Sequence, residues 1–256
     1  MPVEKRIDQI KVNLERIRWV AYGLPSDFVV VDIAGFDAMR FRDGRVVWTS
    51  RVMVGKPVRK TPVFRAQMTH VVLNPTWTVP PTILKQDVLP KLKSNPNYLA
   101  SKGMQLLDEK GNAVQGPWRA GLRVVQPPGP ENALGQYKFD MPNDHAIYLH
   151  DTPSKEKFSL EARAFSSGCI RLEKAREFAV LLLSEQHQWT EQQVDEVIAT
   201  KNTKFIALKQ KIPVLILYLT ATARDNEVEF RPDIYTRDAR LIAALKEPFR
   251  VSWKTN

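Results

Sequence analysis

The chain contains a single cysteine, Cys169, which follows three small residues, Ser166-Ser167-Gly168. Small residues let the backbone turn sharply and present its N–H groups outward. A lone cysteine is often only a small buried apolar side chain, but that role does not require such a setting. A free thiol, with a pKa near ~8.5, becomes a good nucleophile when a base or a cation activates it. We therefore interpret Cys169 as a candidate nucleophile on a loop.

His150 is the candidate base. It ends the apolar run 146–149, which predicts a short buried strand that carries the imidazole at its end. The strand-end histidine and the loop cysteine could then meet, and general acid-base catalysis is typically worth about 10²- to 10⁴-fold. Tyr148 should share the face of His150 in that strand. Its hydroxyl could contact substrate or complete an oxyanion hole, or Tyr148 could be a core residue. Asp151 could orient the imidazole through its carbonyl or its side chain.

Further candidates surround the cysteine. The backbone amides of Ser167, Gly168 and Cys169 are candidate oxyanion donors, and each such donor is typically worth about 10²- to 10³-fold. Arg171 alternates with two apolar residues, so it should lie on the same side as Cys169, where a guanidinium could hold a substrate carboxylate. The structural alternative for Arg171 is a salt bridge to Glu173 or Asp151.

Trp77 lies among Pro75, Pro80 and Pro81, in a segment that can be neither regular helix nor central strand. It could anchor the core at a strand exit, or it could form an aromatic wall of a substrate groove. A helical pattern then interrupts a run of predicted strands. We interpret residues of about 81–119 as an inserted subdomain.

The rest of the pattern predicts one large domain with an N-terminal appendage. We expect an N-terminal helical segment at 1–24 and the main domain at 25–256. An amphipathic helix is predicted over residues 4–20, and its apolar stripe should pack on the domain or on an upstream one, with docking on the domain preferred. That stripe consists of Ile7, Ile10, Leu14 and Ile17.

Two strings, YLHDTP and RAFSSGCIRLEKA, resemble the catalytic signature of the L,D-transpeptidases, the YkuD-type cysteine enzymes that act on bacterial peptidoglycan. His150 falls on the family's upstream histidine, and the signature around the nucleophile covers Gly168, Cys169 and Arg171. Many members have histidine where this chain has Ser167, a departure that resembles the large Gram-negative members with a lid over the site. Ser167 therefore receives no role as a base. The resemblance, which includes VGKPVRKTP, extends from about residue 52 to 174.

This resemblance implies an α+β fold: a mostly β, β-sandwich-like catalytic domain with peripheral helices, in which the insertion is a helical lid. It implies a cysteine acyltransferase of peptidoglycan biosynthesis, the process that maintains the cell wall and cell shape. Cys169 would attack the diaminopimelate carbonyl of a tetrapeptide donor and expel D-Ala, leaving a thioester. The amine of a diaminopimelate acceptor on a second stem peptide would resolve it, with His150 moving the protons. Carbapenems would be inhibitors.

Other functions remain open from the sequence. The same acyl-enzyme could be released by water, as in an L,D-carboxypeptidase or a crosslink hydrolase, because groove shape and dryness rather than the nucleophile choose the acceptor. Papain-like peptidases fit less well, since they usually place Cys before His. An alternative of another class is a noncatalytic cell-wall-binding module whose Cys-His pair is incidental.

The formal charge of +10 and a pI near 9.7 favour anionic partners. The basic residues are scattered, and prolines interrupt their densest cluster at 56–65, which does not indicate a nucleic-acid interface. Carboxylate-rich cell-wall peptides suit the charge as well as nucleic acid does, so composition alone does not choose between them. A basic nucleic-acid binder stays an alternative, although we expect no nucleic-acid partner. Three other histidines, His70, His145 and His187, have no partners at metal-ligand spacing, so we assign no metal and no cofactor.

The compartment follows from the family resemblance. The start MPVEKRID has no basic segment followed by an apolar stretch, so no signal peptide is expected in this chain. The longest uncharged run, 212–223, is shorter than the ~20 residues of a membrane helix. The implied substrate lies outside the cytoplasm, so we expect a periplasmic protein whose signal peptide and any upstream domains are absent from this chain.

Overall fold

The structure is a computed structural model that describes residues 2–224 and 226–247, so the end of the domain expected at 25–256 lies outside the described residues. Strands dominate its main body. They are β1 (Asp27–Asp32), β2 (Asp37–Arg42), β3 (Arg45–Gly55), β4 (Phe64–Leu73), β9 (Tyr137–Asp140), β10 (Leu149–His150), β11 (Ala164–Ser166), β12 (Ile170–Leu172) and β13 (Lys204–Leu217).

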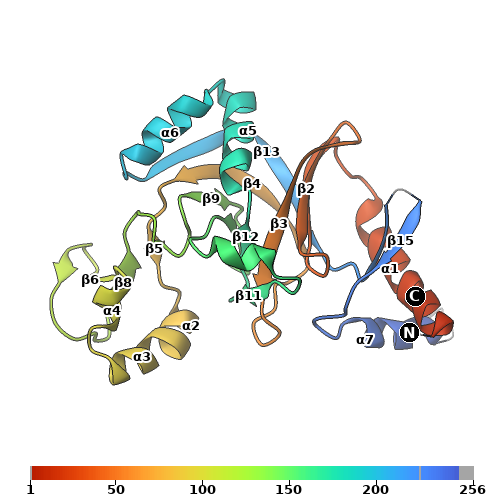
Figure 1. Ribbon diagram of the computed structural model, residues 1–256, viewed down its shortest axis with the longest axis horizontal. Coiled ribbons are helices and arrows are strands. Elements are labelled where there is room, and N and C mark those ends of the chain that lie inside the picture. Colours follow the sequence, from red (N-terminus) through yellow and green to blue (C-terminus); the bar gives the residue numbers. More distant parts are fainter. Residues whose placement is uncertain (1, 225, 248–256) are drawn as a thin grey trace, which may run out of the picture.

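Within this described part, these strands form one sheet in the order β11-β3-β12-β10-β9-β4-β13-β1-β2 (Figure 1). The eleven-residue β3 is long enough to pair with β2 near its start and with β12 and β11 near its end. Because β2 is also the last strand of the sheet order, this pairing closes the sheet on itself. The result is the α+β, mostly β fold that the sequence predicts.

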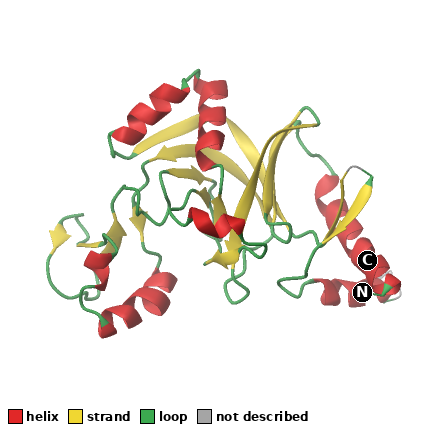
Figure 2. Cartoon of the chain, viewed as in Figure 1, coloured by secondary structure: helices red, strands yellow, loops and turns green. Residues whose placement is uncertain are grey.

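Two helices, α5 (Ala175–His187) and α6 (Glu191–Ala199), lie together beside β4 and β13 (Figures 1 and 2). The side chain of Phe178, on α5, is fully buried and stacks on Trp48 of β3 at a centroid distance of 4.2 Å. The ring centroid of Phe139, on β9, lies 4.9 Å from that of Phe178. The main hydrophobic core is therefore packed between these helices and the sheet.

Residues 77–126 form a separate subdomain, which we call the insertion subdomain and which contains the expected insertion of 81–119. It combines short helices with a four-stranded sheet in the order β5-β8-β6-β7. The helical segment expected from the sequence is therefore only one part of the subdomain. Its elements are β5 (Trp77–Thr78), α2 (Pro81–Ile83), the π-helix η1 (Leu84–Val88), α3 (Leu89–Ser94), α4 (Tyr98–Ser101), β6 (Gln105–Leu107), β7 (Ala113–Val114) and β8 (Arg123–Gln126). A small hydrophobic cluster of its own stabilises it.

The helical pattern before Pro90 contains the π-helical turn η1. The N–H of Leu89 bonds to the carbonyl of Leu84, one residue further back than in an α-helix. Pro90 follows directly and has no N–H to donate, so a regular α-helix could not satisfy every carbonyl of the preceding turn. At Pro90 the helix therefore changes type, from the π-helical turn η1 to the α-helix α3.

The N-terminal helix α1 (Val3–Ala21) docks through the face opposite to the one expected. The predicted apolar stripe is largely solvent-exposed: Ile7, Leu14 and Ile17 are 45%, 58% and 40% exposed. Buried instead are the apolar Val12, at 0%, and the polar Gln9 and Asn13, at 6% and 2%. The helix therefore docks on this domain, as preferred, but the expectation that it does so through the apolar stripe is wrong.

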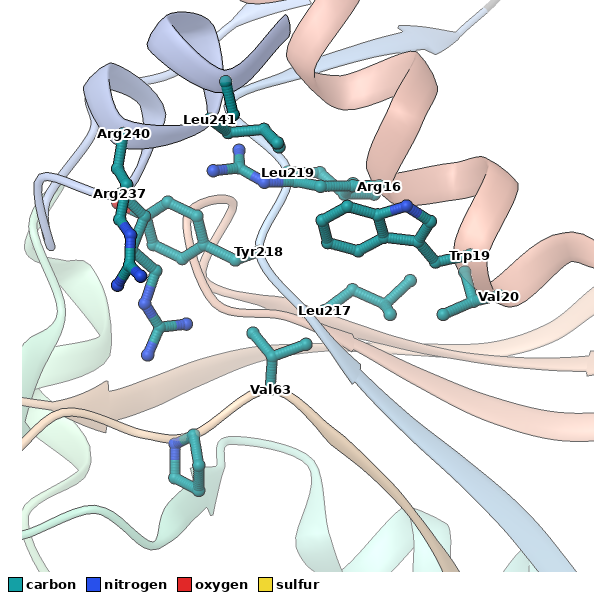
Figure 3. Close-up of a pocket in the computed structure, with 12 residues that line it drawn as sticks. Arg16, Trp19, Val20, Val63, Leu217, Tyr218, Leu219, Arg237, Arg240 and Leu241 are labelled. Carbon is teal, nitrogen blue, oxygen red and sulfur yellow. The ribbon is translucent and has the colours of Figure 1, made fainter. Parts of the chain in front are cut away.

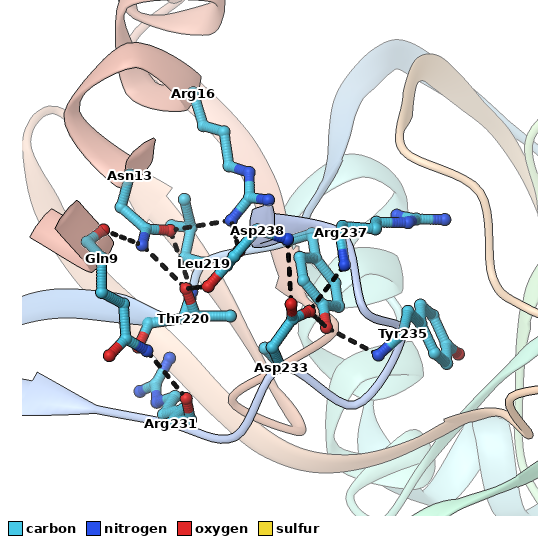
Figure 4. A network of polar contacts seen from close by, with 12 residues as sticks. Gln9, Asn13, Arg16, Leu219, Thr220, Arg231, Asp233, Tyr235, Arg237 and Asp238 are labelled. Carbon is cyan, nitrogen blue, oxygen red and sulfur yellow. Dashed lines mark hydrogen bonds and ion pairs between the residues drawn. The ribbon is translucent and has the colours of Figure 1, made fainter. Parts of the chain in front are cut away.

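Hydrogen bonding explains why the polar face of α1 is buried (Figure 4). Asn13 Nδ2 donates to the hydroxyl of Thr220 at 2.8 Å, and its Oδ1 accepts from the Thr220 N–H at 2.9 Å. Gln9 donates to the carbonyls of Thr220 and Arg231 at 2.7 and 3.0 Å. The chain leaving β13 thus offers polar groups that the helix must satisfy, since buried polar groups without partners are costly.

The C-terminal elements complete this docking. A hairpin of β14 (Ala221–Arg224) and β15 (Glu227–Phe230) follows β13, and helix α7 (Asp238–Lys246) lies beside α1 (Figure 1). A 2.6 Å ion pair joins Arg16 to Asp238. In the part of the chain that the structure describes, no helix combines the length and the hydropathy needed to cross a bilayer.

Candidate active site

Two neighbouring strands position the candidate residues. β10 runs parallel to β12, with Leu149 opposite Ile170 and His150 opposite Arg171. Leu149 and Ile170 are fully buried in the core. Because side chains alternate along a strand, His150 and Arg171 project together from the other face. The strand expected over 146–149 is shorter than predicted, since β10 begins only at Leu149.

Cys169 lies one residue before β12, opposite Tyr148, whose carbonyl accepts the Ile170 N–H at 3.1 Å. The thiol is half-buried, and its Sγ lies 3.8 Å from the carbonyl oxygen of Ala146. Burial raises the pKa of the Cys169 thiol, while hydrogen bonds from the backbone and side chain of Tyr148 lower it. Burial and then the charge of Cys169 raise the pKa of the Tyr148 hydroxyl. A protonated hydroxyl therefore faces the sulfur.

His150 is buried, with 3% of its surface exposed. Its Nδ1 lies 2.5 Å from the backbone carbonyl of Asp151. A carbonyl can only accept, so Nδ1 carries the proton of the neutral ring. Burial first, and then the charge of Arg171, lower the pKa of His150 to about 3. The imidazole is thus neutral at physiological pH, in the state a general base requires. Within the described residues it makes no hydrogen bond to Cys169, although both side chains share one sheet face.

The Asp151 side chain braces the neighbouring loop. Its carboxylate accepts the Gln136 N–H at 3.0 Å and pairs with Lys155. Gly135 has a φ of +62°, and a Cβ there would lie 2.3 Å from Asp151 Oδ2. Of the two roles expected for Asp151, the carbonyl therefore contacts the imidazole and the carboxylate fixes the loop beside it.

Arg171 has no ion-pair partner among the described residues. Glu173 pairs with Arg51, and Asp151 pairs with Lys155, so neither acid expected as its structural partner contacts it. Its Nε is buried without a hydrogen-bond partner. Burial lowers the pKa of the Arg171 guanidinium, which remains charged at any physiological pH. A half-buried guanidinium that has no ion-pair partner in the described part of the chain, on the cysteine face, is suited to bind a carboxylate.

The backbone around the nucleophile is held from both sides. The Thr61 hydroxyl donates to the Gly168 carbonyl at 2.8 Å and accepts the Gly55 N–H at 2.9 Å. Gly168 has a φ of +122°, which only glycine adopts readily. Its own N–H bonds to Ser166 Oγ at 3.0 Å. The amide of Gly168 is therefore occupied, and the predicted oxyanion donors reduce to the amides of Ser167 and Cys169.

Ser167 and Trp77 connect this face to the insertion subdomain. The hydroxyl of Ser167 accepts a 2.9 Å hydrogen bond from Arg59 Nη1. Trp77 packs half-buried against the small cluster of the insertion subdomain, and its side chain lies near enough to Tyr148 to lower the pKa of that hydroxyl, against the larger effect of burial. Both interpretations of Trp77, a packing anchor and a wall next to the site, are compatible with this placement.

Comparison with known proteins gives the family. Residues 26–203 match the model of the YkuD L,D-transpeptidase catalytic domain. The chain belongs to this family. Along 250 residues it is 37% identical to a protein of Haemophilus influenzae that is provisionally named an L,D-transpeptidase, and the match covers 93% of this chain and 50% of the relative. The chain thus spans about half the length of that curated relative. The YkuD assignment agrees with the resemblance drawn from the two signature strings.

Solved L,D-transpeptidases are more distant from this YkuD domain. The catalytic domain of the Enterococcus faecium enzyme, acylated by ertapenem, is 12% identical, with a TM-score of 0.36 over 76% of this chain and 98% of that one. L,D-transpeptidase 3 from Mycobacterium tuberculosis, in complex with a faropenem-derived adduct, is 14% identical, with a TM-score of 0.34 over 75% and 60%. With TM-scores this low, nothing about the site of this chain follows from these two structures.

Lys138 lies on the same sheet face as His150 and Arg171 and was not among the site residues predicted from the sequence. Lys138 of β9 pairs in register with His150 and therefore points to the same side. Its Nζ lies 4.5 Å from the centre of the Tyr148 ring and 2.7 Å from Asp140. Its alternation with the apolar Tyr137 and Phe139 was visible in the sequence, but the register that brings it beside His150 was not.

Two clefts differ in their relation to this face. A cleft of about 490 Å³ lies between α1, α7 and the end of β13 (Figure 3), and none of the candidate site residues lines it. A smaller cleft of about 280 Å³ is lined by His70, Asp140, Ala146 and Tyr148, among others. The smaller cleft is the one next to the nucleophile, because Ala146 also contacts the Cys169 sulfur.

Proposed function

We propose that this chain is the catalytic domain of an L,D-transpeptidase that links two diaminopimelate residues of peptidoglycan through a Cys169 thioester. The observation that carries the proposal is the shared face of β10 and β12. There a half-buried thiol, a neutral imidazole and an unpaired guanidinium lie together. Family membership supports acyl transfer on peptidoglycan, outside the cytoplasm, and we propose a periplasmic location.

In the first half-reaction, Cys169 Sγ attacks the diaminopimelate carbonyl of the tetrapeptide donor while the S–H proton passes to His150 Nε2. Negative charge develops on the carbonyl oxygen, and the amides of Ser167 and Cys169 are placed to bind it, with the Tyr148 hydroxyl as a third donor. When the carbonyl re-forms, the C–N bond to D-Ala breaks. The departing amine takes the proton back from the imidazolium, leaving a thioester.

In the second half-reaction, the side-chain amine of a second stem peptide attacks the thioester carbonyl. His150 accepts the proton that the amine loses and returns it to the leaving thiolate. One amide bond is broken and one is formed, so no external energy source is needed. Arg171 and Lys138, both on this face, are suited to hold the carboxylates that stem peptides carry.

Incubating the protein with one tetrapeptide substrate and analysing the products by mass spectrometry tests this function. A crosslinked dimer with release of D-Ala is the expected product. Tripeptide without dimer would replace transfer with hydrolysis by the same acyl-enzyme. Neither product, from folded protein that binds peptidoglycan, would favour a noncatalytic wall-binding module.

A further inference from the structure

Arg59, in the loop that follows β3, connects the insertion subdomain to the nucleophile loop. Its Nη1 and Nη2 bind the two carboxylate oxygens of Asp87 at 2.5 and 3.1 Å. Nη2 also donates to Gln86 Oε1 at 2.6 Å, and Nη1 to Ser167 Oγ at 2.9 Å. The side chain is only 14% exposed. One guanidinium therefore holds groups from two parts of the molecule that are separated by about 80 residues of sequence.

The loop that carries Arg59 is itself anchored. Thr61 binds the Gly168 carbonyl, and its N–H donates to the Tyr235 hydroxyl at 3.2 Å. Lys60 Nζ donates to the Tyr235 carbonyl at 2.9 Å. A Cβ on Gly55 would lie 2.2 Å from the Arg59 carbonyl, so the loop packs tightly on its own start. Arg59 thus extends from a rigid base rather than from a mobile surface loop.

The other end of the contact is the π-helical turn η1, which holds Gln86 and Asp87. This turn belongs to the insertion subdomain, which has its own hydrophobic cluster and its own sheet. Trp77, at the start of the subdomain, also lies near enough to Tyr148 to lower the pKa of its hydroxyl. Both positions are close to Cys169, because Tyr148 is opposite the cysteine and Ser167 is two residues before it.

We propose that Arg59 is a positioning residue that fixes the insertion subdomain against the nucleophile loop and thereby shapes the groove for the peptide donor. The inference rests on the proposed function, because it assigns the groove to a stem peptide. A substrate long enough to contact both the subdomain and Cys169 depends on this distance being fixed. A small reagent that needs only the thiol and the oxyanion donors depends on it much less.

The test compares Arg59→Met and Asp87→Asn with Arg176→Met. Arg176 is a matched control because it also binds one carboxylate with two nitrogens, that of Asp195, and a second acceptor, Glu191. It joins α5 to α6, two helices that lie away from the insertion subdomain (Figure 1). Hydrogen exchange of residues 81–126, with α5 as the internal reference for global unfolding, measures how firmly the subdomain is held.

We expect amide exchange in the subdomain to accelerate about tenfold in Arg59→Met and Asp87→Asn, and to stay unchanged in Arg176→Met. The KM for the tetrapeptide should rise about tenfold, whereas acylation of Cys169 by a carbapenem should slow less than about threefold. Arg59→Lys should restore only part of the exchange protection and of the tetrapeptide KM. An ammonium keeps the charge but lacks the planar guanidinium that binds a carboxylate through two nitrogens.

Unchanged exchange in both variants would overturn the proposal, since Arg59 would then not hold the subdomain. Equal losses with tetrapeptide and carbapenem would also overturn it, because Arg59 would then act on the nucleophile loop alone. If the wild-type protein reacts with neither compound, the proposed function fails. The exchange measurement still decides whether Arg59 is the link between the two parts.

Discussion

The hydroxyl of Thr61 donates a 2.8 Å hydrogen bond to the carbonyl of Gly168. In a trans peptide the C=O and the following N–H point in opposite directions. The bond therefore sets where the Cys169 N–H points, namely away from Thr61. Because Thr61 is fully buried and also accepts the Gly55 N–H, the orientation of this candidate oxyanion donor is built into the fold before any substrate binds.

Replacing Thr61 by Val keeps the shape of the side chain and removes the hydroxyl. We expect the rate of Cys169 acylation by a carbapenem to fall about 10- to 100-fold, since a misdirected oxyanion donor costs up to about 10³-fold. The Gly55 N–H also loses its partner, so stability should fall by about 1–3 kcal/mol. Stopped-flow acylation and urea unfolding measure the two effects.

Thr61→Ser is the control, because it restores the hydroxyl and should recover most of the acylation rate. A folded Thr61→Val protein that is acylated at the wild-type rate would show that this peptide orientation does not matter for the chemistry.

Replacing Arg171 should weaken binding of the tetrapeptide without lowering the stability of the fold. Its Nε is buried without a partner among the residues that the structure describes, so Arg171→Met removes an uncompensated polar group and should leave the free energy of unfolding unchanged or slightly higher. Binding of the tetrapeptide should weaken about 10- to 100-fold, the range for losing a hydrogen bond to a charged group. Isothermal calorimetry on a Cys169→Ala background measures the affinity.

The matched variant is Arg51→Met, whose arginine is half-exposed and pairs with Glu173. It should leave peptide affinity within about twofold of wild type, because surface ion pairs contribute little. Loss of stability in Arg171→Met with no loss of affinity would assign the arginine to the fold rather than to substrate.

His150 makes the stability depend on pH. Its folded-state pKa is lowered to about 3, below the unfolded value near ~6.5, so the unfolded state binds the proton more tightly. Stability from the neutral imidazole is fully present above about pH 6.5 and is lost as pH falls toward the folded pKa. Between pH 7 and pH 5 the wild-type protein should therefore lose about 2 kcal/mol more than His150→Gln.

Urea unfolding of both proteins at both pH values measures this difference, and other titrating groups cancel between them. Equal losses in the two proteins would mean that the imidazole is not held in its neutral, buried state.

The sequence identifies those features that depend on local pattern. Thr190 and Gln193 have the spacing of a capping box, and at the start of α6 the two residues are bonded reciprocally. The cysteine loop and the histidine strand were found from residue types, and the alternation around Arg171 correctly placed it on the face opposite Ile170 and Leu172.

Features that depend on pairing between distant segments could not be predicted in this way. Lys138 reaches the site only through the register of β9 with β10, and Arg59 only through contacts with a subdomain it does not belong to. For α1, an apolar stripe predicted burial of Leu14, but the hydrogen-bonding needs of Thr220 put Asn13 inside instead. Helix periodicity shows which side chains share a face and not which partner that face will meet.

The central claim is that Cys169 takes an acyl group. Its most direct test is the intact mass of the protein after incubation with a carbapenem, for the wild type and for Cys169→Ala. We predict a single adduct of one carbapenem mass on the wild-type protein, mapped to Cys169 by peptide analysis, and no adduct on the variant. A folded wild-type protein that gains no mass, or an adduct that persists in Cys169→Ala, would contradict the account.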